Sequence, residues 1–115
     1  MITLDGTHIY INRGDTGAIT IKSFGYAFGE NDRCVFTVKA PDGSIVKQVN
    51  AELTNGAFDV AFLHNDTVNL AAGDGYTWGV TYYVNPYWDG TTITDGNLVY
   101  TPHKEPLPFT IWQRV

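Results

Sequence analysis

Hydrophobic and polar residues alternate with a period of two along most of the chain. In the stretch 7–12, for example, Ile9 and Ile11 alternate with His8, Tyr10 and Asn12. Successive side chains of a β-strand point to opposite faces, so this pattern predicts strands with one buried face. The predicted strands are 7–12, 17–23, 33–40, 44–49, 57–62, 76–84, 98–101 and 109–115.

The segments between these strands are rich in turn-forming residues. Pro41, Asp42 and Gly43 predict a hairpin, because proline presets φ and the residues after it tolerate positive φ. No segment keeps a helical period. A single helical turn is predicted around Val68 and Leu70, capped by Asn65 or Asp66 and stopped by Gly73.

About eight strands with turns every ~8–12 residues predict an all-β fold, an antiparallel immunoglobulin-like β-sandwich of about 7–9 strands. We expect one domain, residues 1–115. Tyr76 precedes Trp78 on a late strand, which is typical of a tyrosine corner, although two ordinary strand aromatics would look the same. The predicted core is Ile9, Ile11, Ile19, Ile21, Phe36, Val38, Phe58, Val60, Phe62, Tyr76, Trp78 and Val80.

The tripeptide Arg13-Gly14-Asp15 lies between two predicted strands. Gly14 and Gly17 permit backbone angles that larger residues resist, and Asp15 can bond to local backbone in a turn. Local physics thus accounts for the tripeptide as a structural turn. An adhesive role would need an extended, exposed loop in a secreted protein.

Charge and composition exclude several classes of partner. The chain has a net charge of −5 and a pI near 4.8, and its few basic residues are scattered, which argues against nucleic acid and anionic membranes. We find no secretory signal and no apolar run long enough to span a bilayer. We therefore expect synthesis as a soluble protein in the cytoplasm of a bacterial host.

Residues that carry chemistry are few. Cys34 alternates with Phe36 and Val38, as a buried core residue would. His64 and Asp66 lie two residues apart in a turn, a spacing more typical of capping than of a metal site. No residues suggest a cofactor, and we expect no enzyme. A carboxylate pair for glycoside hydrolysis stays open, since twelve acids are present.

Aromatic residues are the surface feature that suggests function. Tyr83 should point away from the core, Tyr87 and Trp88 lie in a loop, and Trp112 should face opposite to Phe109 and Ile111. Exposed aromatics mark protein interfaces or sugar-stacking platforms, although some could cover a second sheet face. Tyr83, Tyr87, Trp88 and Trp112 are the candidate interface residues.

Four segments together resemble a known family. They are IYINRGDTGAITIKS, CVFTVKAPDGSIV, NDTVNLAAGDGYTWGVTYY and PFTIWQRV. Their order is similar to that of the N-terminal immunoglobulin-like domain of phage baseplate upper proteins and of related small tail modules. The resemblance covers nearly the whole chain and implies a virion assembly role without catalytic residues. The aromatic segment 84–106 departs from the pattern, and the chain is either a stand-alone protein or one domain of a longer one.

From this resemblance we expect a structural module of a phage or prophage tail or baseplate that docks against other virion proteins. Its location would be the virion, and a homo-oligomer is kept open as a further state. The alternative is a carbohydrate-binding module that recognises host cell-wall glycan through Tyr87 and Trp88.

Overall fold

A computed structural model describes residues 1–22, 32–53, 56–84, 87–88, 93–94, 99–100 and 106–113. This part of the chain is mostly strand, which confirms the all-β prediction, and its helix is the short α1 (His64–Thr67). The described strands are β1 (Ile2–Asp5), β2 (His8–Asn12), β3 (Gly17–Lys22), β4 (Arg33–Lys39), β5 (Ile45–Glu52), β6 (Ala57–Phe62), β7 (Gly73–Tyr83), β8 (Tyr87–Trp88), β9 (Ile93–Thr94), β10 (Val99–Tyr100) and β11 (Leu107–Trp112).

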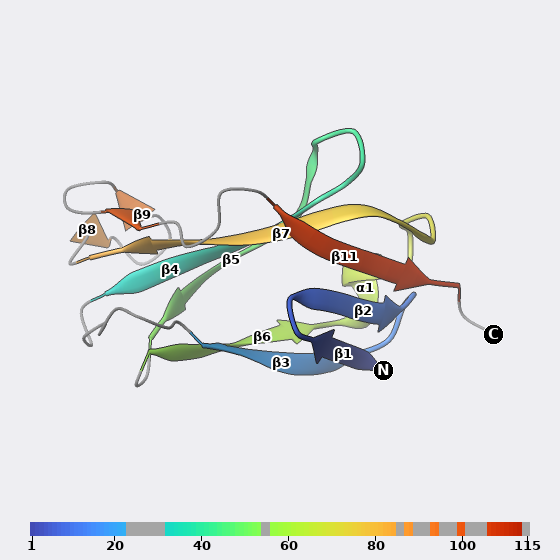
Figure 1. Ribbon diagram of the computed structural model, residues 1–115, viewed down its shortest axis with the longest axis horizontal. Coiled ribbons are helices and arrows are strands. Elements are labelled where there is room, and N and C mark those ends of the chain that lie inside the picture. Colours follow the sequence, from blue (N-terminus) through green and yellow to red (C-terminus); the bar gives the residue numbers. More distant parts are fainter. Residues whose placement is uncertain are drawn as a thin grey trace.

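The strands form two layers (Figure 1). The large sheet has the order β1-β2-β11-β7-β4-β5, and β10 pairs with β7 outside this path. The second sheet is the antiparallel pair β3-β6, which lies below the large sheet in Figure 1. A separate pair, β8-β9, completes the described strands. Tyr87 and Trp88 therefore form a short strand and not the predicted loop, because they pair with Thr94 and Ile93.

The core lies between the two layers. All twelve predicted core residues are buried, and Cys34, Leu53, Tyr82, Phe109 and Ile111 join them. Phe62 of the small sheet contacts Phe36 and Phe109 of the large sheet, with ring centroids 6.3 and 5.8 Å apart. Burying a side chain of this size contributes about 1.5–3 kcal/mol, so these rings hold the layers together.

The prediction that every strand pair is antiparallel is wrong. β2 pairs with β11 in parallel, with Ile9 beside Phe109 and Ile11 beside Ile111. Parallel neighbours need a long crossover connection, and here nearly the whole chain between β2 and β11 supplies it. Local patterns carry no information on the pairing of strands so far apart in sequence.

The first strand, β1, was not predicted. It forms a hairpin with β2 through Gly6 and Thr7, and Gly6 has φ 62°. On its other side β1 approaches β3, where a Cβ atom at Gly17 would lie only 2.4 Å from the Cγ2 of Ile2. A side chain at residue 17 would therefore force Ile2 to move, and the predicted backbone reason holds for Gly14, with φ 81°, but not for Gly17.

Two predictions on turns have different outcomes. The hairpin at 41–43 is confirmed, since the Gly43 amide donates to the Ala40 carbonyl at 2.9 Å. The helical turn lies earlier than predicted, at 64–67, and Asp66 caps it from inside by accepting a 2.7 Å bond from the Leu63 amide. The position is set by contacts of α1 with a distant turn, which the local pattern does not contain.

Candidate functional site

The turn at Arg13-Gly14-Asp15 is fastened to α1. The Asp15 amide donates to the Asn12 carbonyl at 3.0 Å, and the φ of 81° at Gly14 is the value that type II turns have at their third position. The Gly14 amide donates to the Thr67 hydroxyl at 2.8 Å, and the His64 Nδ1 lies 2.7 Å from the Gly14 carbonyl oxygen. Both backbone groups of Gly14 are thus occupied by the helix.

The surroundings of this turn bear on the adhesive alternative. Gly14 is buried, and the Asp15 carboxylate contacts the amino group of Met1. An extended, exposed loop of the kind that an adhesive role would need is not what the residues form here. The structural-turn interpretation accounts for each of these contacts.

Tyr76 is buried and bonds to the backbone of an upstream residue. Its hydroxyl donates to the Ala71 carbonyl at 2.8 Å, five residues upstream. Burial raises the pKa of Tyr76, although the bond to Ala71 acts in the opposite direction. Trp78 lies on the same face, and its Nε1 donates to the Thr7 carbonyl at 2.9 Å.

The candidate interface aromatics have different positions. Trp112 is 42% exposed, on the face opposite to buried Phe109 and Ile111, as predicted. Tyr83 is half-buried at the end of β7. The side chains of Tyr87 and Trp88 lie outside the described residues. Among these candidates, Trp112 is the exposed residue whose neighbouring side chains the structure describes.

Trp112 is the end of a column of three stacked rings on the outer face of the large sheet. The ring of Tyr10 lies 4.9 Å from that of Trp112, and the ring of His8 lies 4.0 Å from that of Tyr10 at an interplanar angle of 10°. The Nε2 of His8 is 2.7 Å from the Thr110 hydroxyl. We call His8, Tyr10 and Trp112 the aromatic column.

Sequence reasoning placed His8 and Tyr10 on the polar face of a strand and did not recognise the column. Their spacing of two residues on one face was the available signal. The third ring joins them only through the parallel pairing of β2 with β11.

Three exposed apolar residues are connected to the turn at 12–15 through backbone bonds or through a neighbouring residue. Met1 accepts a backbone bond from Asn12, and the Trp112 carbonyl accepts one from Arg13. Leu63 directly precedes α1, which holds Gly14, and is 64% exposed. Met1, Leu63 and Trp112 are thus each connected to the turn at 12–15, which lies between β2 and β3 (Figure 1).

Lys47 lies on β5, the edge strand of the large sheet, and its charged side chain points toward the core. Its ammonium group lies 5.0 Å from the centre of the Phe62 ring and donates to the Asp66 carboxylate at 2.9 Å. Burial by itself would raise the pKa of Asp66, but bonds from the Leu63 amide and Lys47 more than offset this and lower it. An inward-pointing charge on an edge strand is a known protection against pairing with another strand.

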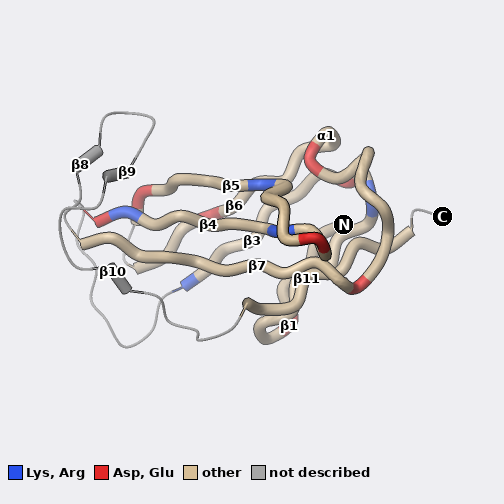
Figure 2. The backbone as a smooth tube through the Cα atoms, turned by 90° about the horizontal axis from the view of Figure 1, so that it is seen from above, with Lys and Arg blue, Asp and Glu red and all other residues tan. Residues whose placement is uncertain are grey.

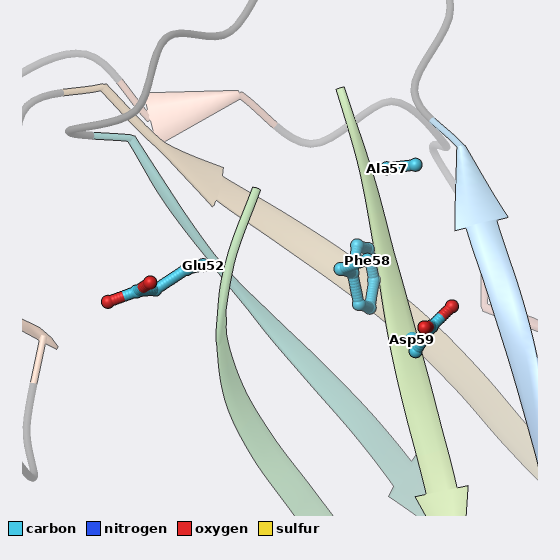
Figure 3. A pocket seen from close by; sticks show the side chains of 4 residues that line it. All are labelled: Glu52, Ala57, Phe58 and Asp59. Atoms are coloured by element: carbon cyan, nitrogen blue, oxygen red, sulfur yellow. The ribbon is translucent and has the colours of Figure 1, made fainter. Parts of the chain in front are cut away.

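A hollow of about 250 Å³ opens between β5 and β6, lined by Glu52, Ala57, Phe58 and Asp59. Figure 3 shows its two carboxylates pointing away from each other. Asp59 accepts a 2.6 Å bond from Thr20, and Glu52 forms an ion pair of 3.6 Å with Arg33. Glu52 and Asp59 are therefore not arranged as the pair that glycoside hydrolysis requires.

The remaining residues of chemical interest have structural partners. His64 contacts the Gly14 carbonyl while Asp66 contacts Leu63 and Lys47, so the two do not face a common point. Cys34 is buried, as predicted, and burial raises the pKa of its thiol to about 12. Within the described ranges, no three His, Cys, Asp or Glu side chains are grouped as a metal site.

Charges of both signs are interspersed along the described backbone (Figure 2). No helix in this part of the chain is long and apolar enough to cross a membrane. A scan against protein-family models finds no match, and searches of curated proteins and of solved structures find none either.

Proposed function

We propose that the chain is an immunoglobulin-like β-sandwich that serves as a structural module of a phage tail or baseplate and docks against other virion proteins. The observation that carries this proposal is the arrangement of the four segments that resemble such modules. They correspond to β2 and β3 with their turn, the β4-β5 hairpin, α1 with β7, and β11, all in one two-layer body.

The bond from Tyr76 to Ala71 supports the immunoglobulin-like assignment. A tyrosine near the start of a late strand that bonds back to upstream backbone is the tyrosine corner of Greek-key sandwiches. The parallel pairing of β2 with β11 also suits a sandwich in which an N-terminal strand and the C-terminal strand lie side by side.

The docking surface that we propose is the side of Leu63 and α1, next to the turn at 12–15. Leu63 exposes a large hydrophobic surface there, and a partner that removes this surface from water gains free energy. Tyr83, Tyr87 and Trp88, which are candidate interface residues from the sequence, would form a second contact near the end of β7.

Virion composition tests this proposal. A phage or prophage would carry Leu63→Ser or, as the matched control, Ala18→Ser, which changes an exposed residue on β3. Purified particles would then be analysed by quantitative mass spectrometry. We expect the chain in parental and Ala18→Ser particles and a clear loss from Leu63→Ser particles. Particles that never contain the chain would contradict the proposal.

The alternative, glycan binding through Tyr87 and Trp88, concerns side chains outside the described residues. The described residues place a different set of rings on the surface, and that set supports an inference of its own.

A further inference from the structure

We propose that the aromatic column is a platform on which a pyranose ring of a neutral glycan stacks, with Trp112 as the contacting ring. This binding site goes beyond the proposed structural role and does not depend on it. The reasons are the fixed orientation of the rings, the polar groups beside them and the charge of the chain.

The orientation of Trp112 is set before any ligand arrives. Tyr10 stacks on the indole at 4.9 Å, and His8 stacks on Tyr10 at 4.0 Å. His8 is in turn held by the buried Thr110 hydroxyl at 2.7 Å. A ligand that binds an already ordered ring has less side-chain entropy to remove, which favours affinity.

The chemistry of the column fits a sugar. The face of an aromatic ring carries partial negative charge, and the C–H groups on one face of a pyranose carry partial positive charge. The hydroxyl groups of the sugar need polar partners at the edge of the ring. Asn12 is the neighbour of Trp112 in the β2-β11 register, and its amide supplies both donors and acceptors.

Other ligands that stack on aromatic rings fit less well. Single-stranded nucleic acid needs a basic groove, whereas this chain has a net charge of −5. A protein partner needs a buried apolar centre, but the β1 residues beside the column are Thr3 and Asp5. A neutral glycan needs neither.

The glycan site and the docking contact use different residues near the turn at 12–15. If Trp112 contacts glycan, the docking contact with another virion protein falls on the side of Leu63 and α1. Leu63→Ser and Trp112→Ala should therefore affect different properties, so failure of one proposal can be distinguished from failure of the other.

Titration of the purified chain tests the column. The probes are neutral oligosaccharides of glucose, galactose, rhamnose and N-acetylglucosamine, with oligo(dT) as a nucleic-acid probe. Binding would be followed by calorimetry and by the indole N–H signals in NMR spectra. We expect saturable binding of at least one sugar and a shift of the Trp112 indole signal.

The variants make the test specific. Trp112→Ala should weaken sugar binding by at least about tenfold, Tyr10→Leu should weaken it by disordering the indole, and Leu63→Ser should leave it unchanged. Thermal unfolding would show that each variant is folded. Three results would overturn the proposal: no saturable sugar binding, binding unaffected by Trp112→Ala but lost in Trp88→Ala, or a preference for oligo(dT).

Discussion

Cys34 shows what burial does to a single ionisable residue. Its thiol is buried in the core, and its pKa in the folded chain is about 12 because burial disfavours the thiolate. In the unfolded chain the pKa is about 8.5, so above that pH the unfolded state loses its proton while the folded state keeps it. Rising pH therefore favours unfolding.

We expect Cys34 to lower the free energy of unfolding by about 2–3 kcal/mol between about pH 7.5 and 10.5. Urea denaturation at both pH values would measure this for the parent chain and for Cys34→Ala. Tyr76 acts in the same direction at the alkaline end, so the comparison with Cys34→Ala isolates the thiol. Equal pH dependence in the two proteins would contradict the expectation.

Tyr76 offers a second residue-scale prediction. Tyr76→Phe removes only the hydroxyl that bonds to Ala71, and we expect a loss of about 1 kcal/mol in unfolding free energy. Tyr10→Phe is the matched control, because it removes a phenol hydroxyl from a half-buried ring on β2. Denaturant unfolding would measure the loss of unfolding free energy in both variants. A smaller loss for Tyr76→Phe than for Tyr10→Phe would argue against a tyrosine corner.

At the scale of elements, the contact between α1 and the turn at 12–15 depends on Thr67. Thr67→Val keeps the side-chain shape but leaves the buried Gly14 amide without its acceptor. We therefore expect the free energy of unfolding to fall by about 1–3 kcal/mol. Thr20→Val breaks an exposed bond to Asp59 and should cost less. Thermal unfolding compares the two, and equal losses would show that the Thr67 bond has no special weight.

The β5 edge yields a prediction on association. Lys47→Met removes the inward-pointing charge and leaves an edge strand that other chains can pair with. Sedimentation velocity should show larger species than for the parent chain, whereas Lys22→Met, a change at an exposed lysine of β3, should not. An unchanged sedimentation profile for Lys47→Met would mean that the edge is protected by other features.

At the scale of the whole molecule, local alternation predicted the strand interiors and the core residues. A strand with one buried face has an apolar residue at every second position, so its sequence shows the burial directly. It did not predict β1, although Asp5-Gly6 is a hairpin signal beside the alternating Ile2 and Leu4. The parallel pairing of β2 with β11 has no local signal at all.

The candidate site also combines a feature with a local sequence signal and a feature that depends on distant segments. The exposure of Trp112 was predictable from its strand, but its stacking on Tyr10 exists only because the two ends of the chain pair. The position of α1 likewise depends on Gly14, some fifty residues away in sequence. Features that need two distant segments were the ones that sequence patterns could not supply.

Labelling of intact particles tests the central proposal most directly. An antibody raised against this chain would be applied to phage particles purified from the cells that encode it, and gold label would be located by electron microscopy. The structural role predicts label at the tail tip. Particles without label, from cells shown to produce the protein, would contradict the virion role, while the glycan proposal would still be decided by its own titration.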